Sequence, residues 1–331
     1  MRVAVIGAGS MGGKHAQLLA GIPDVTQVLV VDAVASRAEA VARDVDGRAM
    51  DAEAALDAAE AAIVATPAHL HADSVEAAMA RGIPVLCEKP LTDTVASSAA
   101  LVKRIEAARA HVEMGFQRRH DAGFVAARDR LADAGPIHLV RLTAFDPRVA
   151  PTDFPPNDVA PIFLHSSVHD FDFVRWISRS EVVEVTADGS RRDAPRPSDV
   201  NDIETAVVTM RMASGALAVL EASWLHPAGY DIRAEVVADR LHVTMGLSTR
   251  TPAEHADWPS DDAAEPWSGY LERFEAAYRA ELVAFLAAAR GERPPASTAR
   301  DGLEALRVAV AATRAYAEHR TVSMTEVVPQ A

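Results

Sequence analysis

The sequence predicts an α/β fold in which a doubly wound parallel sheet is followed by a second domain with a mostly antiparallel sheet. Strand-like apolar runs alternate with helical patterns up to Gly115, which is typical of parallel strands joined by helical crossovers. Beyond Gly115 several strand patterns follow one another, and a Ser214-Gly215 turn between two of them indicates an antiparallel hairpin. The length of 331 residues fits two domains of ~150 residues each. We place them at residues 1–118 and 119–331.

In the first domain, strands and helices are expected to alternate along the chain. The expected strands span residues 2–6, 25–31, 61–65, 84–87 and 112–114. The expected helices span residues 10–20, 36–43, 72–81 and 92–110. Ser36 is expected to cap the second helix, because its hydroxyl can accept a hydrogen bond from an N–H of the first turn. Crossovers between parallel strands are right-handed, so helices are expected on both faces of the sheet.

In the second domain, the expected strands are longer and mostly follow each other directly. They span residues 137–145, 182–187, 203–212, 216–224 and 232–238. The expected helices span residues 122–133, 163–177, 270–290 and 299–319. The proline-rich segment 146–161 is expected to form an ordered loop or lid.

The composition indicates an ordinary globular protein, with 49% hydrophobic and 24% charged residues. The net charge of −14 disfavours binding to nucleic acid. A single cysteine, Cys87, excludes an intramolecular disulfide and favours a reducing compartment. The apolar run at residues 3–6 is too short for a signal peptide, and no run reaches the ~20 residues of a membrane span. We expect a cytoplasmic protein that does not bind membranes.

A glycine-rich turn between the first strand and the first helix is the strongest functional signal. It reads Gly7-Ala8-Gly9-Ser10-Met11-Gly12. In such a motif the first glycine permits the turn, the second lets a pyrophosphate approach the backbone, and the third lets helix and strand pack closely. The N–H groups of the first helical turn then face the phosphates. We therefore expect Gly7, Gly9, Ser10, Met11 and Gly12 to bind a dinucleotide.

An acidic residue at the end of the second strand indicates which dinucleotide is bound. Asp32 lies twenty residues after Gly12. Its carboxylate can accept hydrogen bonds from the adenosine ribose and would repel a 2′-phosphate, so NAD is favoured over NADP. Arg37 lies close enough in sequence to contact the same part of the cofactor. It favours NADP instead, since an arginine can accommodate the 2′-phosphate.

Several motifs beyond the glycine turn resemble one enzyme family. They are Thr66-Pro67 with His71, Glu88-Lys89-Pro90, Gly115-Phe116-Gln117-Arg118-Arg119, Val168-His169-Asp170-Phe171-Asp172 and Gly229-Tyr230-Asp231. At these intervals the chain resembles the Gfo/Idh/MocA family of NAD(P)-dependent sugar and inositol dehydrogenases, and most closely its inositol 2-dehydrogenase branch. The resemblance covers nearly the whole chain. It implies a Rossmann domain, a second α/β domain with a large open sheet, and pairing of such sheets into homodimers or homotetramers.

The resemblance also assigns roles to individual residues. The additional cofactor-binding residues would be Thr66, Pro67, His71, Glu88 and Gln117. The substrate-binding residues would be Lys89, Arg118, His165, His169, Asp172 and Tyr230. Lys89 would be the active-site lysine, preceding a cis peptide bond to Pro90, and His169 would be the catalytic histidine.

This pair fits the oxidation of a secondary alcohol to a ketone. Such a reaction requires removal of the hydroxyl proton as hydride leaves the carbon, and a histidine with an ordinary pKa near ~6.5 suits a general base. A lysine ammonium beside the same oxygen would stabilise developing alkoxide charge. We therefore expect His169 to act as base, or as acid in the reverse direction, and Lys89 to polarise the oxygen of a polyol substrate.

Two positions depart from the family pattern. The family usually has an aspartate four residues before the catalytic histidine, where this chain has His165, and usually has an aromatic residue in place of His120. Residues four apart share a helix face, so His165 and His169 are both expected to face the cleft and His165 is counted with the catalytic residues. The absence of a clear third ligand argues against a metal at this histidine pair.

The exchange of aspartate for His165 leaves two other functions open. Lys89, Arg118, His165 and His169 would form a positive pocket suited to an acidic sugar or another carbonyl compound. A protein that senses NAD or a sugar without turnover is the second alternative, although it would not need Lys89 and His169.

Overall fold

The computed structural model describes residues 1–147, 160–191, 203–252 and 264–328. Contacts divide the chain into two compact units. Of the described residues, unit 1 comprises those within 1–120 and 276–304, and unit 2 comprises those within 121–275 and 305–328. The first segment of unit 1 ends two residues beyond the boundary expected from the sequence. The helical segment 276–304, which the sequence analysis assigned to the second domain, makes its contacts with unit 1.

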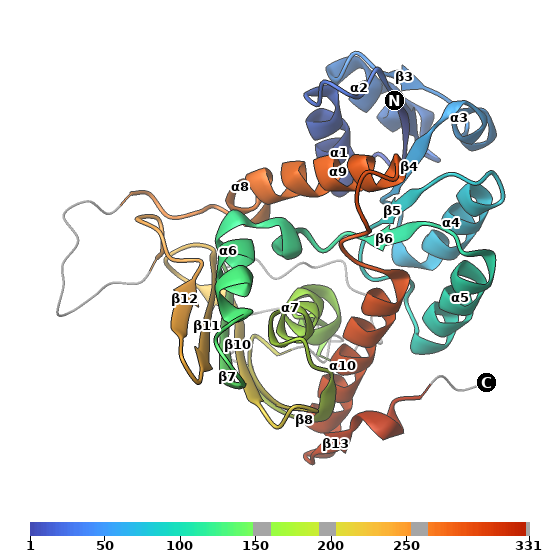
Figure 1. The fold of residues 1–331 in the computed structure, drawn as a ribbon. Helices are drawn as coiled ribbons and strands as arrows, with labels where there is room; N and C mark the ends of the chain where they lie inside the picture. Colours follow the sequence, from blue (N-terminus) through green and yellow to red (C-terminus); the bar gives the residue numbers. More distant parts are fainter. Residues whose placement is uncertain (148–159, 192–202, 253–263, 329–331) are drawn as a thin grey trace. The chain divides into compact units, whose positions relative to one another are not determined.

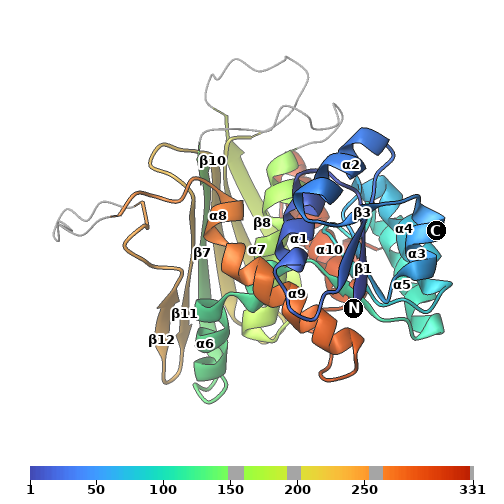
Figure 2. The same ribbon diagram turned by 90° about the horizontal axis from the view of Figure 1, so that it is seen from above.

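Unit 1 contains a six-stranded, fully parallel sheet, here called sheet A, with the order β3-β2-β1-β4-β5-β6. Its strands are β1 (Arg2–Ile6), β2 (Gln27–Val31), β3 (Arg48–Ala49), β4 (Ala61–Val64), β5 (Val85–Cys87) and β6 (Val112–Met114). Figure 2 shows α1 and α2 on one side of this sheet and α4 and α5 on the other. The doubly wound parallel sheet predicted from the sequence is confirmed.

Side chains cap two of the helices of unit 1. The helical elements of this unit are α1 (Ser10–Ala20), α2 (Ala35–Asp44), α3 (Ala52–Ala58), η1 (Ala68–Leu70), α4 (His71–Met79), α5 (Val95–Ala108), η2 (Gln117–His120) and α9 (Glu275–Ala289). Asp51 caps α3 and Thr94 caps α5, each by accepting a hydrogen bond from a first-turn N–H. The prediction that Ser36 caps α2 is wrong, because the helix already begins at Ala35 and Val34 occupies the N-cap.

Unit 2 contains a seven-stranded sheet, here called sheet B, with the order β12-β11-β7-β10-β9-β8-β13. Its strands are β7 (Ile137–Pro147), β8 (Val182–Ser190), β9 (Thr205–Met212), β10 (Leu217–His226), β11 (Asp231–Ala238), β12 (His242–Met245) and β13 (Val322–Ser323). Only β7 and β10 pair in parallel, so the sheet is mostly antiparallel as predicted. The Ser214-Gly215 turn joins β9 to β10, and Gly215 has a φ of +89°.

Helices cover one face of sheet B, and its strands alternate accordingly between buried and exposed residues. The helical elements of unit 2 are α6 (Ala122–Leu131), η3 (Ile162–Ser166), α7 (Val168–Ser178), α8 (Tyr270–Arg273), η4 (Met324–Glu326) and most of α10 (Ala299–Glu318). Figure 1 shows α7 and α10 on the concave side of the sheet. The expected helix at 270–290 is interrupted at Phe274, and most of the expected loop at 146–161 lies outside the described residues.

The expected helix at 163–177 contains a change of helix type. Residues Ile162–Ser166 form a π-helical turn, and α7 follows from Val168. The N–H of Ser167 donates to the carbonyl of Ile162, which is five residues earlier. A π turn is wider than an α turn and frequently occurs at functional sites.

Candidate active site

The predicted cofactor residues of unit 1 lie where strands of sheet A end. Gly7 follows β1, Asp32 follows β2, Thr66 follows β4, Glu88 follows β5 and Gly115 follows β6. The strand order reverses between β1 and β4, and ligands of open parallel sheets bind at the carboxyl ends of strands beside such a reversal. The topology therefore brings these residues to one edge of the sheet.

The three glycines of the turn have different surroundings. A Cβ on Gly7, whose φ is +98°, would lie 2.6 Å from the carbonyl oxygen of Ala65, and one on Gly12 would lie 1.7 Å from the carbonyl oxygen of Gly7. Gly9 forms the N-cap of α1, and a Cβ there would meet no atom within 4 Å. The first and third glycines thus permit close packing, while the second leaves open space at the start of the helix. This arrangement fits a pyrophosphate, whose oxygens can accept hydrogen bonds from the first-turn N–H groups of Ser10 and Met11.

Asp32 holds the backbone around this turn. Its carboxylate accepts hydrogen bonds from the N–H groups of Ala8 and Val34, both at 2.8 Å, and lies 3.5 Å from the Arg37 guanidinium. Partial burial acts to raise the pKa of Asp32, but the two N–H groups and Arg37 outweigh it and hold the pKa below its usual value. Asp32 is therefore an anion that would face the cofactor ribose, and Arg37 is engaged by it.

The turns after β4 and β5 are joined by His71. Its Nδ1 lies 2.9 Å from the carbonyl oxygen of Pro90, and its Nε2 lies 2.7 Å from the carbonyl oxygen of Thr66. The histidine is buried, whereas Pro67 is exposed and Thr66 is partly exposed. His71 thus connects the turn after β4 to the turn after β5, which carries Lys89. The peptide bond between Lys89 and Pro90 is cis, as expected.

Glu88 is buried beside Lys89 and pairs with a histidine that the sequence analysis missed. The Nε2 atom of His15, on α1, lies 2.7 Å from Oε1 of Glu88, and the other carboxylate oxygen accepts a 3.2 Å hydrogen bond from the N–H of Lys89. Burial acts to raise the pKa of Glu88, but the His15 contact and the Lys89 charge outweigh it and lower the pKa. A polar residue among the buried Ala16, Leu18 and Leu19 of α1 was the signal that could have revealed His15.

Two further predicted residues of unit 1 lie in η2. Gln117 and Arg118 are only 2% and 4% exposed. The side-chain oxygen of Gln117 is buried without a hydrogen-bond partner in the described structure. The short helix follows β6 directly, at the same edge of sheet A as the glycine turn.

In unit 2, the two predicted histidines are among the partly exposed residues of a short, largely buried segment. His165 lies in the π turn and His169 in the first turn of α7, and both are partly exposed while Ser167, Val168 and Asp170 are buried. His165 lies within the π turn and His169 within α7, so the backbone between them is not the regular α-helix expected from the sequence. Both side chains nevertheless reach solvent from the same short segment.

The remaining predicted residues of unit 2 are buried. Asp172 is 2% exposed and lies 3.8 Å from the guanidinium of Arg175. Tyr230, which precedes β11, is 5% exposed and packs edge-on against Phe274 with ring centroids 6.3 Å apart. In the described part of the chain, no group of three histidine, cysteine, aspartate or glutamate side chains could hold a metal ion.

Comparison with known proteins identifies the family. The model of an oxidoreductase family with an NAD-binding Rossmann fold, Gfo/Idh/MocA, matches residues 1–116, and the model of the corresponding C-terminal domain matches residues 124–243. The chain belongs to the Gfo/Idh/MocA family. Its cofactor is NAD, which fits the glycine turn and the Asp32 carboxylate described above.

Individual relatives match over almost their whole length. A myo-inositol dehydrogenase of Streptomyces leeuwenhoekii is 35% identical over 95% of this chain and 97% of its own length. An inositol 2-dehydrogenase of Rhizobium meliloti is 31% identical over 98% of this chain and 99% of its own length. Among solved structures, a myo-inositol dehydrogenase of Sinorhizobium meliloti, described as putative, superposes with a TM-score of 0.88 at 31% identity, covering 98% of this chain and 99% of its own.

Proposed function

We propose that this enzyme oxidises a secondary alcohol of an inositol or a closely related polyol to a ketone, with NAD as the hydride acceptor. Support comes from the full-length relatives, which are named as inositol dehydrogenases, and from the Glu88-Lys89-Pro90 turn at the cofactor edge of sheet A. Bound NAD supplies the site that accepts hydride from the carbinol carbon.

The chain's own residues would handle the proton and the charge on oxygen. His169 is partly exposed on the first turn of α7, where its imidazole can take the hydroxyl proton. Lys89 is partly exposed, and its turn is held by His71 and Glu88. Its ammonium would stabilise the oxygen as negative charge develops. Asp172 and Tyr230 would orient the remaining hydroxyl groups, and Arg118 and Gln117 would orient substrate and cofactor.

The test is the appearance of NADH absorbance when the protein and NAD are incubated with a panel of polyols. The panel contains myo-inositol, scyllo-inositol and open-chain polyols. Reduction of NAD by at least one inositol supports the proposal, and its abolition in Lys89→Met with retained NADH binding assigns the lysine. An enzyme that binds NADH but oxidises no member of the panel contradicts it.

A second candidate substrate is an acidic sugar. The observation that favours it is His165, which is partly exposed in the same short segment as His169. Two imidazoles can donate hydrogen bonds to a carboxylate, which an aspartate would repel. Uronic and aldonic acids in the same assay decide between the two, because turnover of neutral polyols alone excludes the acidic substrate.

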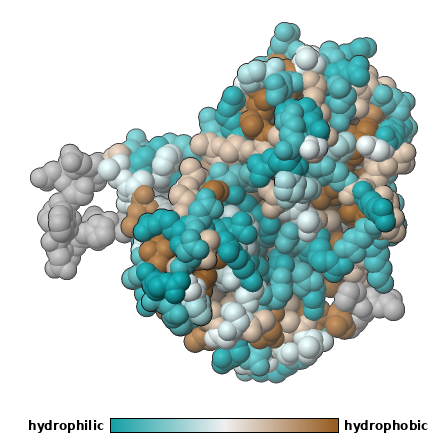
Figure 3. Space-filling view, in the orientation of Figure 1, coloured by the Kyte–Doolittle hydropathy of each residue, from teal (hydrophilic) through white to brown (hydrophobic). Residues whose placement is uncertain are grey.

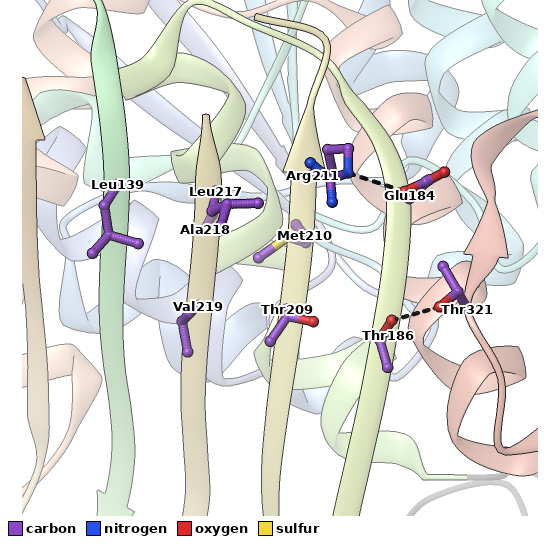
Figure 4. A pocket seen from close by; sticks show the side chains of 10 residues that line it. All are labelled: Leu139, Glu184, Thr186, Thr209, Met210, Arg211, Leu217, Ala218, Val219 and Thr321. Carbon is purple, nitrogen blue, oxygen red and sulfur yellow. Dashed lines mark hydrogen bonds and ion pairs between the residues drawn. The ribbon is translucent and has the colours of Figure 1, made fainter. Parts of the chain in front are cut away.

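We further propose that the protein forms homodimers or homotetramers through the face of sheet B that carries no helices. This face exposes Val207 and Leu217, which are 44% and 47% accessible. It also contains a hollow of about 350 Å³, which includes the ion pair of Glu184 and Arg211. Figure 4 shows that its lining side chains come from neighbouring strands of the sheet and from Thr321, which precedes β13. The residues that line it are Leu139, Glu184, Thr186, Thr209, Met210, Arg211, Leu217, Ala218, Val219 and Thr321.

The test of self-association is the molar mass by light scattering. Leu217→Glu should convert the oligomer to monomer, whereas the same change at the exposed Leu247, outside sheet B, should leave the mass unchanged. A monomeric wild-type protein contradicts the proposal.

We also propose a cytoplasmic location. The single cysteine, Cys87, is buried and reduced, and burial raises the pKa of its thiol well above the ordinary value. In the described residues, none of the helices is long and apolar enough to cross a membrane. The face of the molecule in Figure 3 is mainly hydrophilic, with hydrophobic residues in small separate patches. Recovery of the protein in a membrane or secreted fraction contradicts this location.

A further inference from the structure

Helix α9 presents one unusual face to the rest of unit 1. Tyr278 packs edge-on against His15 with ring centroids 6.0 Å apart, and Phe285 packs edge-on against His111 at the same distance. Glu281 lies between these two aromatic residues, three positions after one and four before the other, so all three share one face of the helix. A carboxyl group therefore occupies the middle of a buried, otherwise aromatic contact.

Glu281 has no hydrogen-bond partner in the described structure. It is 1% exposed, and both of its carboxyl oxygens are buried without a donor. An unpaired buried carboxylate is so costly that such a group normally takes up a proton. The charges of Glu88, after β5, and of Glu113, on β6, act on it, and His15 of α1 contacts Tyr278 on the same face of α9.

The neighbouring carboxylates have their own partners. Glu88 pairs with His15, while Glu113 receives hydrogen bonds from His111 at 2.8 Å and from the N–H of Ala296 at 3.0 Å. Burial raises the pKa of Glu281 well above its ordinary value, and the charges of Glu88 and Glu113 raise it further.

His15 has one unused ring nitrogen. Its Nε2 donates to the Glu88 carboxylate, whereas its Nδ1 is buried with no hydrogen-bond partner in the described structure. Two buried polar groups without partners, Nδ1 and the Glu281 carboxyl, are therefore associated with the same aromatic contact between α1 and α9. The two groups do not bond each other directly in the described structure. Through a bridging water molecule or a change of side-chain rotamer, a neutral acid can donate towards Nδ1, and this would fix the imidazole tautomer whose Nε2–H points to Glu88.

We propose that Glu281 is a positioning residue for the cofactor site, acting as a neutral carboxylic acid through His15 on the Glu88 carboxylate. This rests on the proposed function, in which Glu88 belongs to the cofactor site and Lys89 stabilises the charge on the substrate oxygen. Glu281 does not touch the reacting atoms. It sets which nitrogen of His15 carries the proton, and so keeps Glu88 oriented and charged where its second oxygen accepts the N–H of Lys89.

The direct test is the protonation of Glu281 in the wild-type enzyme at pH 7. Infrared spectroscopy should show the C=O band of a neutral carboxylic acid, and this band should be absent in Glu281→Gln. The matched control is Glu39→Gln on the exposed surface of α2, which should leave the band unchanged. A wild-type spectrum without the band contradicts the proposal, and this measurement requires neither substrate nor turnover.

Two variants separate positioning from packing. Glu281→Leu removes the donor but fills the space, so it should keep or raise the Tm while weakening NADH binding and lowering kcat by about tenfold, as for one lost hydrogen bond to a buried group. Glu281→Gln retains a neutral donor and should recover most of that loss. Wild-type NADH affinity and kcat in Glu281→Leu, or a loss in Glu281→Gln as large as in Glu281→Leu, would overturn the proposal.

A failure of this proposal about Glu281 can be distinguished from a failure of the proposed polyol oxidation. If no polyol is oxidised, NADH affinity and the carboxylic acid band still decide the role of Glu281. If Glu281→Leu does not fold, the wild-type band and the Glu281→Gln variant decide it.

Discussion

The glycine turn offers a matched pair of substitutions with opposite expected effects. In Gly12→Ala the new methyl group would lie 1.7 Å from the carbonyl oxygen of Gly7 and 2.8 Å from its carbonyl carbon. Real Cβ atoms essentially never approach closer than 3.0 Å, so the strand end or α1 must move by roughly 1.3 Å. In Gly9→Ala the methyl group meets no atom within 4 Å, and the φ of −72° suits alanine.

The magnitudes follow from these distances. Forcing a methyl group into packed backbone costs typically 1–3 kcal/mol, and a contact this short puts Gly12→Ala at about 3 kcal/mol or more. For a unit of this size that corresponds to a fall in Tm of about 6–12 °C. Gly9→Ala should change the Tm by less than about 2 °C, because nothing is displaced. Its methyl group would instead stand where the pyrophosphate approaches, and should weaken NADH binding by at least about tenfold.

Thermal unfolding and a fluorescence titration with NADH measure the two effects separately. The interpretation of the turn is refuted if Gly12→Ala is as stable as the wild type. It is also refuted if Gly9→Ala binds NADH with wild-type affinity, since the open space at Gly9 would then not be the pyrophosphate site.

Three further substitutions test other parts of the site. Asp32→Ala removes the carboxylate that accepts hydrogen bonds from the Ala8 and Val34 N–H groups and that would face the ribose, so the Tm should fall. The preference for NAD over NADP in kcat/KM should shrink by at least about tenfold. An unchanged preference contradicts this role. Burial, with help from neighbouring arginines, lowers the pKa of His120 in the folded protein from 6.5 to about 4. As the pH falls, the unfolded chain therefore takes up a proton on this histidine before the folded protein does. The free energy of unfolding should decrease between about pH 6.5 and pH 4 for this reason. His120→Phe should therefore lose less Tm than the wild type between pH 7 and pH 5, and equal losses would show that His120 does not contribute. His165→Asp should raise kcat/KM for myo-inositol by about tenfold and lower kcat/KM for any acidic sugar. The reason is that a carboxylate accepts hydrogen bonds from hydroxyl groups and repels other carboxylates. A fall in kcat/KM for myo-inositol together with a rise for an acidic sugar contradicts the role given to His165.

The parts of the fold that sequence reasoning found are those with a regular local pattern. Val3, Ala4, Val5 and Ile6 are all buried, and such apolar runs between helices predict a parallel sheet because both of its faces are covered. The glycine turn was recognisable because each glycine meets a separate steric demand. By contrast, β3 has only the two residues Arg48–Ala49 and carries no periodicity, and the following α3 is short and rich in alanine.

The parts of the site that sequence reasoning missed depend on contacts between segments that are distant in the sequence. His15 belongs to the first helix, and the face of α9 that covers it is near the end of the chain, so no local pattern associates His15 with Glu281. The π turn before α7 escaped detection because one inserted residue per turn hardly changes the apolar pattern of a buried segment. His71 was expected to line the cofactor groove, and only the structure shows that its two ring nitrogens lie 2.9 Å and 2.7 Å from the backbone carbonyl oxygens of Pro90 and Thr66.

We propose that Lys89 and His169 serve one hydride transfer between a polyol and NAD. The measurement that tests it most directly is the initial rate of NADH formation with saturating myo-inositol in the wild type, Lys89→Met and His169→Gln, alongside NADH affinity. We expect a measurable wild-type rate that falls by about a hundredfold or more in each variant, while NADH affinity stays within about threefold. Wild-type rates in either variant would contradict the claim.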